Sequence, residues 1–89
     1  MILEMKKFGN ILNSRPSAGE AVLRVKQIIN GNADEEIILD YNGVEVLTPS
    51  FADELINGIK KLYPSKQLKY SGYENNDMVK DVLEKLGIV

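Results

Sequence analysis

The residues that could carry chemistry gather between Val44 and Asn57, where Thr48 and Ser50 stand just ahead of Asp53 and Glu54. Hydroxyl and carboxyl groups at this spacing are typical of a helix start, where side chains satisfy free backbone amides. Either Thr48 or Ser50 could serve as the N-cap. Ser50 is also a candidate phosphoacceptor, because a phosphoryl group at a helix start strongly changes the local charge.

Catalysis by this stretch lacks the usual partners, because the chain contains no histidine and no cysteine. If Ser50 were a nucleophile, its nearest following lysine would be Lys60, about three helical turns away. The phosphate-binding patterns GxxxxGK[ST] and GxGxxG are also absent. We therefore predict no catalytic residues, no cofactor and no enzymatic activity.

The acidic residues admit two interpretations. Asp40, Asp53 and Glu54 could offer carboxylate oxygens to Mg²⁺ or Ca²⁺, but their spacing matches neither ion's usual loop. Acids in the first turn of a helix are favoured by the helix dipole, by about 0.3–1 kcal/mol each. We expect this second role, and no metal site.

Arg15 is the other charged residue of interest, because it precedes Pro16 at an expected helix start. A positive charge is unfavourable there, so Arg15 should find a carboxylate or a phosphate group. It could form an ion pair with Asp40 or Asp53, or it could bind an anionic ligand. The ion-pair and ligand interpretations both require the two segments to lie close together in the fold.

The N-terminal half of the chain supplies the first elements around these residues. Residues 2–7 and 11–13 are extended in character, and Gly9-Asn10 between them suits a hairpin or one bent strand. A helix is then expected to begin at Ser17, whose spacing to Glu20 suits a capping box. Its apolar face repeats through residues 18–29, and the helix ends at residues 30–31.

The second half of the chain continues the alternation of strands and helices. Residues 37–41 form an apolar run that predicts a central parallel strand buried on both faces, and residues 44–47 remain extended. A second helix follows and ends before Pro64, a strand spans residues 68–73, and Asn75-Asn76-Asp77 can cap a last helix that ends at Gly87. Further apolar residues are expected to face inward, namely Ile28, Leu62 and Met78.

This order, β(β)αβαβα, predicts a single small α/β domain over residues 1–89, with a mostly parallel or mixed sheet and helices. The carboxyl ends of parallel strands should meet at one edge of the sheet. The net charge of −2 and the scattered lysines and arginines argue against nucleic-acid binding. No apolar run is long enough to cross a membrane, and residues 1–8 do not resemble a signal peptide, so we expect a cytoplasmic protein.

Two separated segments, FGNILNSRPSA (residues 8–18) and DYNGVEVLTPSFADEL (residues 40–55), resemble the STAS-like domain family of unknown function. That family pairs an "FG…SR..A" element with a strand ending in Asp and an "sFaDEL" helix start. The wider similarity is to STAS domains, including bacterial anti-sigma-factor antagonists, whose phosphorylatable serine opens a helix after a central strand. Ser50 matches that place, although Thr48-Pro49-Ser50-Phe51 stands where the antagonists have Asp-Ser-Ser-Gly.

The resemblance implies a regulatory or adaptor module that binds a partner protein, namely an ATPase or kinase of the anti-sigma type. Phosphorylation of Ser50 would act as the switch. The implied interaction surface consists of Thr48, Ser50, Phe51, Asp53 and Glu54. An alternative function is a sensor of a small anionic ligand or nucleotide, held by Arg15 and the amides of the second helix.

Overall fold

The computed structural model describes all 89 residues and confirms the predicted fold class, a small α/β domain with three helices and parallel strands. Two short 3₁₀ helices, η1 and η2, accompany these elements. In chain order the elements are β1 (Ile2–Glu4), η1 (Met5–Phe8), β2 (Ile11–Leu12), α1 (Arg15–Ile29), β3 (Glu36–Asp40), β4 (Val46–Leu47), α2 (Pro49–Leu62), β5 (Gln67–Ser71), η2 (Tyr73–Asn75) and α3 (Asp77–Lys85).

The strands form two parallel sheets. In the larger sheet the order is β1-β3-β5, so β3 is central, as its apolar run predicts. In the smaller sheet, β2 pairs with β4. Glu4, Asp40 and Ser71 lie in register at the carboxyl ends of the three strands of the larger sheet. The strand ends therefore meet at one edge of the sheet.

The expected hairpin or bent strand in residues 2–13 is wrong. The helix η1 separates β1 from β2, and each of the two strands pairs with a different, distant strand. Gly9 has a φ of 127°, a backbone angle that glycine adopts readily because it lacks a Cβ atom. This path buries Met5 before the turn and Leu12 after it in the same core.

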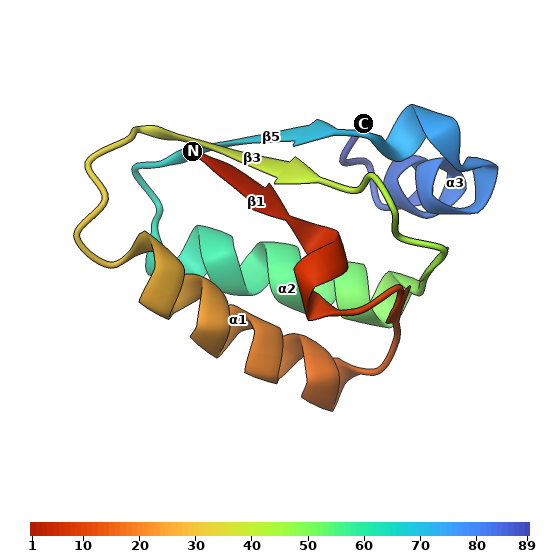
Figure 1. The fold of residues 1–89 in the computed structure, drawn as a ribbon, viewed down its shortest axis with the longest axis horizontal. Helices are drawn as coiled ribbons and strands as arrows, with labels where there is room; N and C mark the ends of the chain where they lie inside the picture. Colours follow the sequence, from red (N-terminus) through yellow and green to blue (C-terminus); the bar gives the residue numbers. More distant parts are fainter.

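Helices α1 and α2 cover one face of the three-stranded sheet, while α3 lies near the end of the sheet where the strands finish (Figure 1). In β3, Ile37 and Leu39 are buried and Ile38 between them is only partly buried. The expectation that β3 is buried on both faces is therefore wrong. Its side chains alternate because helices cover only one face of the sheet.

The contact between α1 and α2 depends on Gly58. A Cβ atom at this position would lie 2.7 Å from Cγ2 of Val22 in α1, closer than two carbon atoms pack. Glycine therefore allows the two helices to approach one another, at some cost to helix propensity. The close contact sets how near α1 and α2 lie to each other at this point.

The helix boundaries correct one prediction and confirm another. Helix α1 is capped by Ser14, whose Oγ accepts from the Ser17 backbone amide at 3.4 Å, and not by Ser17 itself. The helix begins earlier because Pro16 lies in its first turn, where a missing N–H leaves no hydrogen bond unmade. Helix α3 is capped by Asn76, as predicted, through the amides of Met78 and Val79.

The chain reverses direction at the end of α3. Leu86 is the C-cap residue of this helix, and Gly87 follows with a φ of 72°. The Ile88 amide donates to the Leu83 carbonyl and the Gly87 amide to the Glu84 carbonyl, both at 2.9 Å. These two bonds are the Schellman pattern, which turns the chain back over the helix. Residues 86–88 therefore return toward the rest of the domain.

Three apolar residues that were expected to face inward are exposed, because each helix has neighbours on only part of its surface. Their exposed fractions are 45% for Ile28, 42% for Leu62 and 52% for Met78. Each lies on the border of an apolar stripe whose centre is buried. None of the three helices combines the length and apolar character needed to cross a membrane.

Candidate functional site at the start of helix α2

The cap of α2 belongs to Thr48. Its Oγ1 accepts a hydrogen bond from the Phe51 amide at 3.3 Å, and Pro49 occupies the first helical position. The Thr48 amide donates to the Leu12 carbonyl at 3.0 Å, which attaches the helix start to the small sheet. Of the two predicted caps, the structure therefore selects Thr48, and the start of α2 is held in place from both sides.

Ser50 lies exposed in the first turn of α2. Because Thr48 already satisfies the Phe51 amide, the Ser50 hydroxyl does not serve as the N-cap. Ser50 therefore presents an accessible hydroxyl at this site, and this hydroxyl is not needed to cap the helix. This is the arrangement that the sequence left open as an alternative.

Arg15 reaches across from the start of α1. Its Nη1 lies 3.4 Å from Asp53 Oδ2 and 3.2 Å from Glu54 Oε2, and the three side chains are about half exposed. Asn57, one turn further along α2, donates to Asp53 Oδ1 at 2.9 Å. The starts of α1 and α2 lie close together, so the ion pair with Asp53 that the sequence offered as one alternative forms here.

Asp40 does not join this cluster. Its Oδ1 accepts from the Asn42 amide at 3.1 Å and from the Ser71 hydroxyl at 3.4 Å, at the carboxyl ends of β3 and β5. A Cβ atom on Gly72 would approach Asp40 Oδ1 to 2.5 Å, so glycine is needed beside it. Asp40 therefore organises the turn after its strand, and the expected alternative of an Arg15–Asp40 pair does not occur.

Phe51 also lies apart from the exposed surface, since only 1% of it is accessible to solvent. It shares the inward stripe of α2 with Leu55, because residues four apart lie on the same side of a helix. The exposed residues of the predicted surface are thus Ser50 and Glu54, whereas Thr48 and Asp53 are partly buried. No three His, Cys, Asp or Glu residues meet in a group that could hold a metal ion.

Sequence reasoning missed Glu54 as a second partner of Arg15 and missed Asn57 as a support for Asp53. A guanidinium group carries several donors, so an arginine facing two adjacent acids can contact both. The spacing from Asp53 to Asn57, one helical turn, was a further signal. These contacts mean that most polar groups at the start of α2 already have partners within the protein.

The groups with shifted pKa values lie outside this cluster. Tyr41 follows β3 and is almost fully buried, and its hydroxyl has no hydrogen-bond partner. Burial raises the pKa of Tyr41 well above its usual value, and the nearby Tyr70 raises it further. Burial also raises the pKa of Tyr70, which is less enclosed. Both phenols therefore remain protonated at neutral pH.

The fold and the site together define a small parallel α/β domain whose second long helix opens with an exposed serine. The chain belongs to the family described as the STAS-like domain of unknown function, whose sequence profile matches residues 18–78. The matched region contains all of α2 and its cap, whereas residues 8–17 of the upstream motif lie outside it. Searches of curated proteins and of solved structures found no match.

Proposed function

We propose that this protein is a non-enzymatic regulatory or adaptor module that binds a partner protein through the α2-start surface, defined as Arg15, Thr48, Ser50, Asp53 and Glu54. The observation that carries the proposal is the exposed position of Ser50 beside a firmly held helix start. A rigid, exposed and charged surface of this kind can be recognised by a partner with little loss of conformational entropy.

Phosphorylation of Ser50 would act as the switch through Arg15. Asp53 and Glu54 follow Ser50 by three and four residues, so all three side chains lie on one side of the helix. A phosphoryl group would be favoured by the helix start and repelled by the two carboxylates. Arg15 would exchange these carboxylates for the phosphate, because guanidinium–phosphate pairs are strong and bidentate. One modification would thus change both the charge and the partner of Arg15.

The class of partner comes from the family similarity. STAS-like domains resemble anti-sigma-factor antagonists, and we propose an ATPase or kinase of the anti-sigma type as the partner, in the cytoplasm. The charge of the chain, −2 with lysines and arginines dispersed among acids, favours a protein partner over nucleic acid.

The alternative, a sensor that holds a nucleotide or another small anion at the same place, has less support. Arg15 already contacts two carboxylates, and the Phe51 amide already donates to Thr48. A small anion would have to displace these partners without the large contact area of a protein. A rise in melting temperature with a nucleotide panel would favour this alternative, because ligands that bind the native state stabilise it.

The proposal is tested by placing a photo-crosslinking residue at position 50, in cells that naturally make the protein. Position 27, an exposed glutamine near the other end of α1, provides the control. We expect position 50, and not position 27, to capture a protein with an ATP-binding domain. Absence of any crosslink specific to position 50 would contradict the proposal.

The captured partner then allows a test of the switch. With purified proteins, Ser50→Asp should change the affinity by about tenfold or more, whereas Ser65→Asp should change it by less than about twofold. Ser65 is an exposed serine outside the α2-start surface, so it controls for the added charge. Equal affinities for wild type and Ser50→Asp would rule out the switch while leaving the interaction itself intact.

A further inference from the structure

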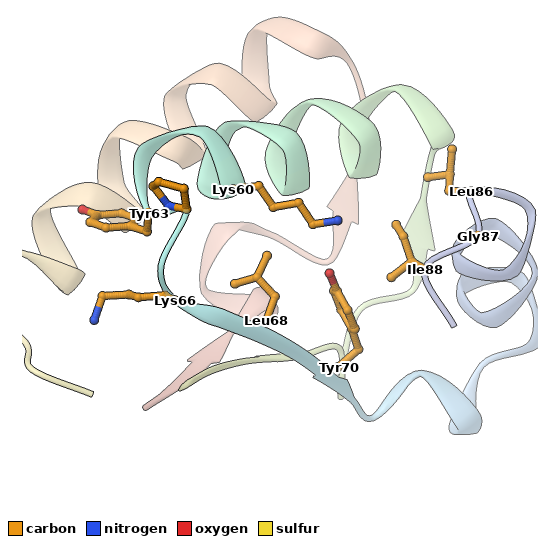
Figure 2. Close-up of a pocket in the computed structure, with 9 residues that line it drawn as sticks. Lys60, Tyr63, Lys66, Leu68, Tyr70, Leu86, Gly87 and Ile88 are labelled. Carbon is orange, nitrogen blue, oxygen red and sulfur yellow. The ribbon is translucent and has the colours of Figure 1, made fainter. Parts of the chain in front are cut away.

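A groove of about 490 Å³ is lined by residues from the end of α2 and the turn after it, from the strand β5 and from the turn after α3 (Figure 2). Strand β5 is at the edge of its sheet, so no further strand covers this side. The groove has a mixed lining of apolar and polar side chains: Lys60, Tyr63, Pro64, Lys66, Leu68, Tyr70, Leu86, Gly87 and Ile88. Its size lies within the usual range for small-molecule sites, about 300–1,000 Å³.

Two polar groups point toward one another in this groove. Figure 2 shows the Lys60 side chain descending from α2 and the Tyr70 side chain rising from β5, with the ammonium and hydroxyl groups facing each other. Lys60 takes part in none of the ion pairs of the protein. Because burial raises the pKa of Tyr70, its hydroxyl keeps its proton and can donate a hydrogen bond.

The second lysine of the groove has a different role. Lys66 Nζ donates to the backbone carbonyls of Asn32 and Asp34, and Figure 2 shows it directed away from Lys60 and Tyr70. Lys66 therefore ties the start of β5 to the loop before β3. The positive charge available inside the groove is that of Lys60 alone.

Apolar side chains form the rest of the wall. Leu68, Leu86 and Ile88 are partly buried and pack against the main core, so each still offers some surface to the groove. The groove thus combines one cation, one hydroxyl donor and the apolar side chains of Leu68, Leu86 and Ile88. Covering the exposed apolar surface of these side chains with a ligand is favourable, by about 25 cal/mol per Å².

We propose that this groove binds a small amphipathic carboxylate, a free acid with one ionised carboxyl group and an aliphatic or aromatic body. The carboxylate would accept from Lys60 Nζ and from the Tyr70 hydroxyl, and the body would lie against Leu68, Leu86 and Ile88. A single cation matches a single negative charge, whereas a phosphate group carries nearly two charges at neutral pH. A ligand with two groups of opposite character therefore fits both parts of the lining.

The site shares no residue with the proposed protein-binding surface. It uses the second half of α2 and none of the residues around Ser50. A ligand here would stabilise the contact between α2, β5 and the turn after α3, because it would touch all three segments at once. The ligand is thus expected to stabilise the folded protein whether or not a partner protein is bound.

The experiment follows backbone amide signals of the full protein by NMR during titration with octanoate at neutral pH. We expect shifts of residues lining the groove, saturating below about 10 mM, which corresponds to weak but specific binding. Octanol, which has the same apolar body without the charge, should bind at least about fivefold more weakly, because it lacks the ion pair with Lys60.

Matched variants identify the group that holds the charge. Lys60→Gln should weaken octanoate binding by about fivefold or more and leave octanol binding within about twofold of wild type. Lys61→Gln changes the neighbouring exposed lysine, which does not line the groove, and should leave both affinities unchanged. Tyr70→Phe should weaken octanoate by a smaller factor, since one neutral hydrogen bond is lost.

Three outcomes would overturn the proposal: no shift at the groove with octanoate, equal weakening by Lys60→Gln and Lys61→Gln, or equal affinity for octanoate and octanol. A shift that maps to the α2-start surface would place the anion site at Arg15 instead. Because Lys60 and Lys61 are both exposed, neither substitution is expected to prevent folding.

Discussion

Helix α2 contributes to two polar regions, and they differ in whether their charged groups are paired within the protein. At its start, Thr48 caps the helix and Arg15 contacts two carboxylates, so the polar groups are paired within the chain. In the groove along its second half, Lys60 has no ion pair and points toward the Tyr70 hydroxyl, beside the apolar side chains of Leu68, Leu86 and Ile88. The charged groups of the first region can bind a partner only by exchanging existing contacts. The second can add a ligand without losing any.

The two regions should differ most in how much their apolar residues stabilise the fold. Phe51→Ala, in the core beneath the α2 start, should lower the free energy of unfolding by about 3–5 kcal/mol, because it leaves a cavity. Leu68→Ala, in the partly open wall of the groove, should cost about half as much or less. Urea denaturation measures both values.

If Phe51→Ala does not fold, Phe51→Leu provides the same comparison with most of the volume retained, and should still lower the free energy of unfolding by about 1 kcal/mol. Equal losses for the Phe51 and Leu68 substitutions would break the contrast. They would indicate that the groove wall is as tightly enclosed as the core and leaves no room for a ligand.

Tyr41 is a core residue that lines neither region, and removing its hydroxyl should stabilise the protein. The hydroxyl is buried without a partner, so Tyr41→Phe should raise the free energy of unfolding by about 1–2 kcal/mol. For a domain of this size, the melting temperature rises by about 4–8 °C per kcal/mol. Tyr63→Phe is the control, because the Tyr63 hydroxyl makes a hydrogen bond to the Lys26 carbonyl. It should not raise the melting temperature.

The same residue predicts a pH dependence. The pKa of Tyr41 is raised in the folded protein, so unfolding favours ionisation once the pH exceeds the unfolded value of about 10. The stability associated with the protonated phenol is present below that pH and is lost as the pH rises further. Tyr41→Phe should therefore lose less stability than wild type between neutral and strongly alkaline pH. An identical alkaline loss in both proteins would contradict this assignment.

The smallest expected change in stability is at the start of α2, where the capping hydroxyl of Thr48 can be compared with the exposed hydroxyl of Ser50. Thr48→Ala should lower the free energy of unfolding by about 1 kcal/mol, because it leaves the Phe51 amide without its cap. Ser50→Ala should change it by less than about 0.5 kcal/mol. Urea denaturation again supplies the measurement. A loss at Ser50 as large as that at Thr48 would mean that Ser50 is needed for folding.

Local signals predicted several features correctly because they depend on residues close together in the chain. Asn76 caps the last helix through amides two and three residues ahead, and Gly87 takes the positive φ that ends it. The apolar run of β3 indicated a central parallel strand. The same kind of reasoning failed for residues 2–13, since β1 and β2 are paired with strands more than thirty residues away.

In the candidate sites, too, some features follow from neighbouring residues and others depend on contacts between distant segments. The sequence by itself determined that Thr48 or Ser50 would cap a helix and that Arg15 would need a carboxylate or a phosphate group, since both follow from the charge and amides of a helix start. Only the tertiary structure decided that Arg15 meets Asp53 and Glu54, because that contact depends on how α1 and α2 cross. It alone also assembled the groove, whose lining comes from three segments with no common sequence pattern. Packing between distant elements sets such contacts, and no local spacing encodes them.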